Sequence, residues 1–259
     1  MRVATYNVHK CRGIDGRIRP ERIVEVLREI DADIIALQEV ACRAGTRRVD
    51  HQARYVTEEL GLHSHLGETR RYRGGPYGNL LLSRLPIHFA RHHDLSIRGR
   101  ERRGLLRADV QLGENSWLHL FNVHLGTAVV ERRIQARDIF RRRLFTNPEL
   151  GSNKIILGDF NEWTRDLPSE FLSNHFESAN SHMQASRTTT FPGFLPMFAL
   201  DYIYFDRGLK LQDVTIHRSR MAQIASDHLP LVAEFSVPMD SANGYESLLP
   251  PFFAPADSN

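Results

Sequence analysis

Cysteine is scarce in this chain of 259 residues, which contains only Cys11 and Cys42. The two do not form a Cys-x-x-Cys pair, and their number argues against both a disulfide framework and a structural zinc site built on thiolates. A reducing compartment fits this composition. A regulatory disulfide between Cys11 and Cys42 is the one redox function that the count leaves open.

Long apolar runs are also missing, although 41% of the residues are hydrophobic and 25% are charged. No stretch approaches the roughly 20 apolar residues that a membrane-spanning helix needs. Arg2 is followed at once by a strand-like run, without the apolar segment of a secretory signal. We therefore expect a soluble, cytoplasmic protein of ordinary globular composition without a transmembrane segment.

Lysine is almost absent, since Lys10, Lys154 and Lys210 are the only lysines among 34 Lys and Arg residues. The formal net charge is +3, and the isoelectric point is about 9.0. Arginine is the better bidentate ligand for phosphate. A codon bias toward arginine explains the same excess, so charge alone favours a phosphate-bearing partner only weakly.

Periodicity and turn residues divide the chain into helices and strands. Helices are predicted over residues 20–30, 52–60 and 129–145. Strands are predicted over residues 3–8, 33–37, 79–83, 105–112, 117–125, 154–158, 199–205, 211–217 and 231–237. Many strands are apolar on both faces, and two packed β-sheets with helices outside would cover them. We expect one α/β domain over residues 1–238 and a proline-containing tail over residues 239–259.

Polar residues stand at or next to the ends of the predicted strands, and two of them share one face of the strand over residues 117–125. They are Asn7, Glu39, Asn122, His124, Asp159, Asn161, Asp201, Asp227 and His228. Taken singly, an Asp or Asn at such a place is most often a turn former or a helix cap. Glu39 and His124 are not turn formers, and an unpaired charge beside an apolar strand is costly. If the strand ends meet at one edge of the sandwich, carboxylates, carboxamides and imidazoles come together there.

This set of side chains suits one chemistry best. Carboxylate and amide oxygens are hard ligands that suit Mg²⁺ or Mn²⁺ rather than zinc. Two histidines can donate hydrogen bonds to phosphate oxygens, and a further carboxylate can activate water. These are the parts of metal-assisted phosphoester hydrolysis.

The strings TYNVH, LQEV, GDFN and SDHLPLVAEF, in this order, resemble the endonuclease/exonuclease/phosphatase superfamily. The resemblance covers nearly the whole body of the chain. It implies a four-layer α/β sandwich with two packed mixed β-sheets flanked by helices, which agrees with the strand pattern. It also implies a metal-dependent phosphoric ester hydrolase, DNase-like or sphingomyelinase-like.

The resemblance further implies roles for single residues. Glu39 would be the main metal ligand, with Asn7 close by and Asp227 binding the metal directly or through water. Asp159 would position or deprotonate the attacking water, and Asn161 would hold Asp159 or a phosphate oxygen. The other roles concern the two imidazoles. His228 would contact the scissile phosphate, Asp201 would pair with His228, and His124 would be a second phosphate donor.

The substrate class follows less directly. The tyrosine and Pro-Asn-Gly pattern of AP endonucleases and the Cys-Asp-Arg signature of inositol phosphatases are absent. We expect a Mg²⁺-dependent phosphodiesterase, first of all a nuclease, with basic stretches at residues 70–75 and 98–107 gripping a polyanion. For residues 141–143 we prefer a solvated helix face.

Two alternatives stay open. The first is a phosphatase or phosphoesterase for a phospholipid head group or a small molecule, which an apolar rim around the site would favour over a basic groove. The second is a catalytically inactive binding module of the same fold. The intact set of acids, amides and histidines argues against that second alternative.

Overall fold

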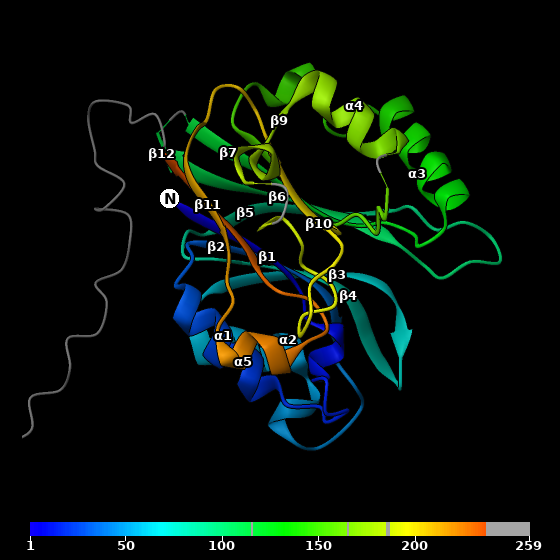
Figure 1. Ribbon diagram of the computed structural model, residues 1–259, viewed down its shortest axis with the longest axis vertical. Coiled ribbons are helices and arrows are strands. Elements are labelled where there is room, and N and C mark those ends of the chain that lie inside the picture. Colours follow the sequence, from blue (N-terminus) through cyan, green and yellow to red (C-terminus); the bar gives the residue numbers. More distant parts are fainter. Residues whose placement is uncertain (115, 165, 185–186, 237–259) are drawn as a thin grey trace, which may run out of the picture.

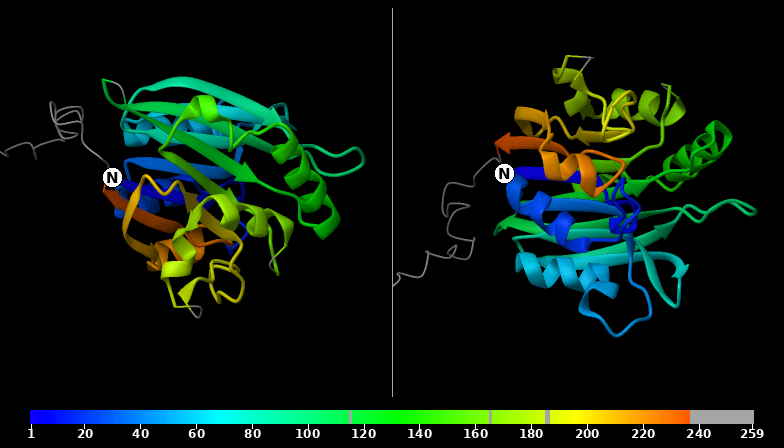
Figure 2. Two further views of the ribbon diagram at one scale, coloured as in Figure 1. Left: turned by 90° about the horizontal axis from the view of Figure 1, so that it is seen from above. Right: turned by 60° about the horizontal axis from the view of Figure 1, so that its bottom comes forward.

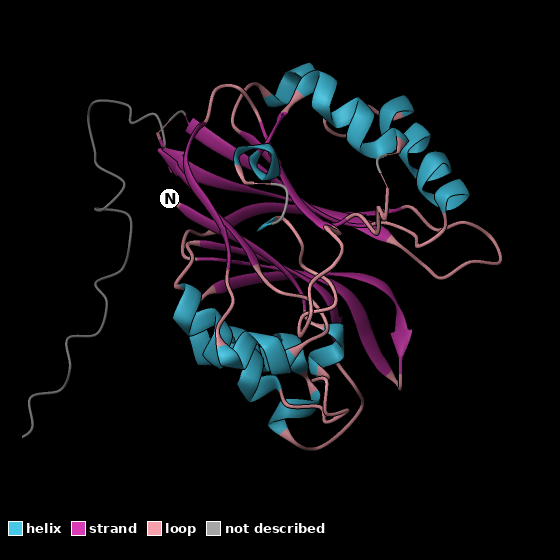
Figure 3. Ribbon diagram, viewed as in Figure 1, coloured by secondary structure: helices cyan, strands magenta, loops and turns pink. Residues whose placement is uncertain are grey.

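The computed structural model describes residues 1–114, 116–164, 166–184 and 187–236. Two six-stranded mixed sheets pack face to face, and helices cover their outer sides (Figure 1; Figure 3). This confirms the predicted α/β sandwich. The predicted tail over residues 239–259 lies outside the described residues, so the division into domain and tail stays a prediction.

The first sheet contains both ends of the described chain. Its strand order is β11 (Lys210–Ile216), β12 (Leu231–Ser236), β1 (Arg2–Asn7), β2 (Ile34–Ala41), β4 (Gly75–Ser83) and β3 (His63–Tyr72). The β1 and β2 strands are parallel, while the other neighbours are antiparallel. Helices α1 (Pro20–Ile30), α2 (Gln52–Leu60) and α5 (Arg220–Ala225) lie across its outer face (Figure 2, right).

The second sheet repeats this plan with one parallel pair. Its order is β5 (Ile87–Asp94), β6 (Gly104–Gly113), β7 (Ser116–His124), β8 (Lys154–Asp159), β10 (Asp201–Phe205) and β9 (Glu177–Ser178). Strands β7 and β8 are parallel. Helices α3 (Val129–Arg141) and α4 (Leu167–His175) lie on its outer side (Figure 1).

The core is apolar, with one polar bridge between the sheets. Buried Val, Ile and Leu side chains fill the space between the sheets and under α1 and α2. Between them Gln38 Nε2 donates to Asn122 Oδ1 at 2.9 Å, and Asn122 Nδ2 donates to the carbonyl of Leu80 at 3.0 Å. Both amides are fully buried. Because buried amides need partners, this bridge fixes how the two sheets face each other.

The predicted elements agree closely with the observed ones. Helices α1 and α2 have the predicted bounds, whereas α3 ends at Arg141 and turns replace its predicted last residues. The prediction missed strands β3, β5 and β9 and helices α4 and α5. No helix in the described part of the chain is long and apolar enough to cross a membrane, and the cytoplasmic location stays a prediction.

Candidate active site

The strand ends that carry the predicted polar residues meet at one edge of the two sheets. Both parallel pairs, β1 with β2 and β7 with β8, end there, because parallel strands share their direction. The register of the second sheet places Asp159 opposite both His124 and Asp201. The eight predicted site residues at this edge are Asn7, Glu39, His124, Asp159, Asn161, Asp201, Asp227 and His228.

Asp159 is the centre of the cluster. Its Oδ2 accepts a hydrogen bond from Asn7 Nδ2 at 2.9 Å and lies 3.6 Å from His124 Nε2 and 3.8 Å from His228 Nε2. The side chain is buried. Burial raises the pKa of Asp159, and the two neighbouring imidazoles act against this rise. A carboxylate in this setting is held in one orientation, and its raised pKa makes it a better proton acceptor than an exposed Asp.

His228 lies between two buried carboxylates. Its Nδ1 is 2.8 Å from Asp201 Oδ2, and the same oxygen accepts a hydrogen bond from Thr190 Oγ1 at 2.6 Å. Burial would lower the pKa of His228, but the negative charges of Asp201 and Asp159 raise it to about 10. The ring is therefore a cation at neutral pH, with its Nε2 directed toward Asp159.

His124 has the opposite electrostatic setting. Burial and the nearby Arg103 guanidinium lower the pKa of His124 to about 4, although Asp159 and Glu39 oppose this. The ring is therefore neutral at neutral pH. The site pairs one charged and one neutral imidazole beside the same carboxylate.

Asn161 supports the site through its backbone and its side chain separately. Its amide N–H donates to Asp159 Oδ1 at 2.8 Å, while its carboxamide donates to the carbonyl of Leu125 at 3.0 Å. Its φ is 51°, a left-handed conformation that Asn adopts more readily than most residues. The side chain contacts the end of β7, whereas the sequence led us to expect it on Asp159 or on substrate.

The three predicted metal ligands surround the opening of the site. Asn7 Nδ2 lies 3.5 Å from Glu39 Oε1. Glu39 also accepts a hydrogen bond from Lys10, and Asp227 lies 3.2 Å from His9 Nδ1 and accepts from Ser226 Oγ at 3.4 Å. Burial acts to raise the pKa of both carboxyls, but in each case the neighbouring positive groups prevail and the net shift is downward.

These ligands fit a hard divalent cation. Glu39 and Asp227 keep part of their carboxylates exposed, and the amide of Asn7 adjoins Glu39, so the donors are oxygens of the kind that Mg²⁺ prefers. Across the described residues, no group of three or more His, Cys, Asp or Glu side chains stands ready-made for a metal. A cation that keeps several waters, as Mg²⁺ does, needs no such group.

Sequence reasoning missed several residues of the site. Thr190 orients Asp201, and Ser226 Oγ donates to the carbonyl of Asn7 at 2.8 Å, which ties the loop before β12 to β1. His9 ends the string TYNVH and Lys10 follows it, but neither carried an expected role. Threonine and serine are common loop residues, so no local pattern marks them.

The two sides of the opening differ in polarity. On one side are the end of β3 with its turn into β4 and the loop between β5 and β6, which carry the exposed Arg71, Arg73, Arg98, Arg100 and Arg102. Arg70 Nη2 donates to Glu101 Oε1 at 2.9 Å and links these two segments.

The other side of the opening is apolar. The loop over residues 191–198 closes on itself through hydrogen bonds between Phe191 and Phe198. Its Phe194, Leu195 and Met197 are 62%, 60% and 63% exposed. The Phe191 ring lies 5.0 Å from the ring of His228. This loop, which we call the apolar loop, thus extends from the site to solvent.

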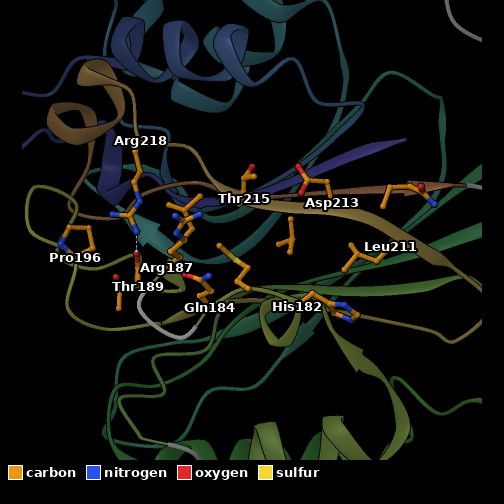
Figure 4. Close-up of a pocket in the computed structure, with 13 residues that line it drawn as sticks. His182, Gln184, Arg187, Thr189, Pro196, Leu211, Asp213, Thr215 and Arg218 are labelled. Carbon is orange, nitrogen blue, oxygen red and sulfur yellow. Dashed lines mark hydrogen bonds between the residues drawn. The ribbon is translucent and has the colours of Figure 1, made fainter.

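A cavity of about 780 Å³ lies elsewhere, between β11 and the segments around His182 and Thr189 (Figure 4). Arg187 and Arg218 approach it from one end, and Arg218 donates to the carbonyl of Thr189 at 3.2 Å (Figure 4). None of the eight site residues lines it. This cavity is therefore separate from the catalytic edge.

The fold and this cluster define a phosphoester hydrolase. The chain belongs to the endonuclease/exonuclease/phosphatase family, whose model matches residues 4–228. It is 29% identical over 246 residues to the protein YbhP of Escherichia coli K12, covering 90% of this chain and 95% of that protein.

Two solved structures show the same fold. A conserved protein from Enterococcus faecalis V583 superposes with a TM-score of 0.74 at 20% identity, covering 91% of this chain and 99% of that one. The mannosyl-6-phosphatase of Bacteroides thetaiotaomicron gives a TM-score of 0.73 at 18% identity, covering 92% and 100%. At these identities the likeness concerns the fold.

Both cysteines lie in the described part of the chain, and both are free and buried. Burial, with the neighbouring Cys42, raises the pKa of the Cys11 thiol. A buried thiol with a raised pKa reacts slowly. The regulatory disulfide therefore gains no support.

Proposed function

We propose that this protein is a Mg²⁺- or Mn²⁺-dependent phosphodiesterase, with nucleic acid as its first candidate substrate. The observation that carries the proposal is the axis from Asp201 through His228 to Asp159. A buried acid fixes a charged imidazole, and that imidazole faces a second buried carboxylate across 3.8 Å. A reacting phosphate beside this axis meets a proton acceptor and a cationic donor together.

Each residue then has a role that its contacts support. Asp159 orients the attacking water and takes its proton, because its raised pKa brings it closer to the working pH. His228 donates from Nε2 to a phosphoryl oxygen and stabilises the charge that develops in the transition state. His124, which is neutral, provides a second donor, and Asn161 holds Asp159 through its backbone amide.

Glu39, with Asn7 and Asp227 nearby, would hold the metal. When bound, Mg²⁺ or Mn²⁺ supplies positive charge to a phosphoryl oxygen and lowers the pKa of a water. In this structure Lys10 and His9 contact the same carboxylates.

A nucleic acid is the first candidate because of the arginine side of the opening. Arg71 near the end of β3, Arg73 on the turn that follows, and Arg98 and Arg100 on the loop between β5 and β6 add exposed positive charge on this side. Such positive charge binds a phosphate backbone without reading its sequence.

A phosphoester with a large apolar group, such as a phospholipid, is the second candidate. The apolar loop favours it, because the exposed side chains of Phe194, Leu195 and Met197 form the kind of apolar surface that binds an apolar ligand. An inactive binding module has less support, because the whole predicted set is retained and assembled.

Hydrolysis of bis(p-nitrophenyl) phosphate and of the mono-ester, with Mg²⁺, Mn²⁺ or EDTA, tests the reaction. We expect cleavage of the diester that requires metal and stops with EDTA. Preference for the mono-ester would move the protein to the phosphatases. No turnover of either ester, of single-stranded DNA or RNA, or of phospholipid vesicles would contradict the proposal.

A further inference from the structure

Backbone strain is concentrated where Lys10 meets Glu39. Four of the nine non-glycine residues with positive φ in the described chain are His9, Lys10, Cys11 and Glu39, with φ of 44°, 60°, 54° and 59°. L-residues with side chains rarely adopt this conformation, and it persists only where the surroundings enforce it. Such strain on both partners of one contact points to a function for that contact.

The surroundings that enforce it are buried and specific. Gln52 is fully buried; its Nε2 donates to the carbonyl of Lys10 at 2.6 Å, and its Oε1 accepts from the amide of Ala41 at 2.9 Å. Ala41 follows Glu39 by two residues on β2. One side chain therefore fixes the backbones of both Lys10 and the strand that carries Glu39.

The Lys10 side chain turns inward rather than into solvent. Its Nζ donates to Glu39 Oε2 and lies 5.9 Å from the centre of the Tyr77 ring. The side chains of Lys10 and Glu39 are 22% and 17% exposed. Most lysines extend their ammonium group into water, so a lysine held over the main candidate metal ligand is unusual.

We propose that Lys10 is a built-in counter-ion that competes with the divalent cation for Glu39 and thereby sets the metal affinity of the site. This inference rests on the proposed metal-dependent function. The ammonium group keeps the Glu39 carboxylate in place and neutralised before metal binds. A metal at Oε2 must displace the ammonium group, because one carboxylate oxygen cannot hold both cations closely, and a metal at Oε1 must bind beside its positive charge.

Two linked consequences follow from this competition. Without Lys10 the metal-free protein keeps a half-buried carboxylate that has lost its closest partner, so it should be less stable. The metal should then bind more tightly, because no ammonium group has to leave. Both effects come from one coupling free energy, so they must change together.

Calorimetric titration of Mn²⁺ into full-length wild-type, Lys10→Met, Lys10→Gln and Lys10→Arg proteins tests the proposal. We expect about tenfold tighter Mn²⁺ binding in Lys10→Met and Lys10→Gln, and near wild-type affinity in Lys10→Arg. Lys210→Met, which removes an exposed lysine from β11, should not change the affinity. In EDTA the two neutral variants should melt below wild type, and saturating Mn²⁺ should reduce that difference.

A Glu39→Gln background provides the internal control. There the Lys10→Met substitution should change the affinity much less, because the carboxylate for which Lys10 and the metal compete is gone. Unchanged or weaker Mn²⁺ binding in Lys10→Met and Lys10→Gln, with the wild type binding normally, would overturn this inference alone. A wild type that binds no Mn²⁺ and hydrolyses no phosphoester would overturn the proposed function with it.

Discussion

The Nδ1 of His228 lies 2.8 Å from Oδ2 of Asp201, a buried carboxylate from another strand end. This contact, together with Asp159, keeps the pKa of His228 at about 10. Because the folded-state pKa lies above the unfolded value, the pair stabilises the fold fully below about pH 6.5. That stability is lost as pH rises through about 10.

An Asp201→Asn substitution should move the alkaline limb of the pH profile. It removes the nearest negative charge, so the pKa of His228 falls and the ring loses its proton at lower pH. We expect kcat/KM at pH 8 to fall on the order of 100-fold and the alkaline limb to shift toward neutrality. A Thr190→Val variant keeps the charge and should show a much smaller shift. An unchanged limb in Asp201→Asn would contradict the role given to this pair.

The amide bridge between the sheets should control stability rather than activity. An Asn122→Leu substitution leaves Gln38 Nε2 without its 2.9 Å acceptor in a dry core. We expect a loss of about 2–4 kcal/mol in the free energy of unfolding, measured by urea denaturation with an unchanged m-value. Gln212→Leu, at an exposed amide, is the matched control and should change stability by less than about 0.5 kcal/mol. Equal effects would show that the bridge is dispensable.

The arginine side of the opening favours a nucleic acid as substrate, whereas the apolar loop favours a phospholipid. Reversing charge with Arg71→Glu and Arg73→Glu should weaken single-stranded DNA binding and flatten its dependence on salt if nucleic acid is the substrate. Arg141→Glu, on α3, is the matched control and should have little effect. Binding that is insensitive to both reversals would remove the case for a polyanion.

Substitutions in the apolar loop test the second candidate. Phe194→Ser and Leu195→Ser should reduce binding to phospholipid vesicles if a lipid is the substrate, because they remove apolar area that the interface would bury. Hydrolysis of bis(p-nitrophenyl) phosphate should stay near wild type, since neither side chain contacts Asp159 or His228 in the described structure. Vesicle binding that is absent in the wild type as well would leave nucleic acid as the better substrate.

Much of the fold could be predicted because its buried strands are continuous apolar runs. The segment at β8, IILGD, is buried throughout and was found directly. Strand β3 was missed because it is an edge strand with mostly exposed or half-exposed polar residues, HSHLGETRRY. Edge strands lack the apolar pattern from which strands are recognised.

The prediction of the site rested on acids, amides and histidines that adjoin apolar strands in the sequence, such as Glu39, Asp159 and His228. The sequence alone could not show which hydrogen-bond partner each of these side chains has. Thr190 reaches Asp201, and Lys10 reaches Glu39, only because the two sheets bring distant segments together. The orientation of Asn161 also depends on tertiary structure, because its carboxamide donates to the carbonyl of Leu125, just after β7.

The most direct test of the central claim compares wild type, Asp159→Asn and Asp109→Asn in the hydrolysis of bis(p-nitrophenyl) phosphate with Mg²⁺. Asp109 is the matched control, a buried acid whose Oδ1 lies 2.8 Å from His119 Nδ1, away from the catalytic edge. We predict that Asp159→Asn lowers kcat on the order of 10²–10⁴-fold while the protein stays folded, and that Asp109→Asn keeps wild-type kcat. Wild-type turnover in Asp159→Asn would contradict the account.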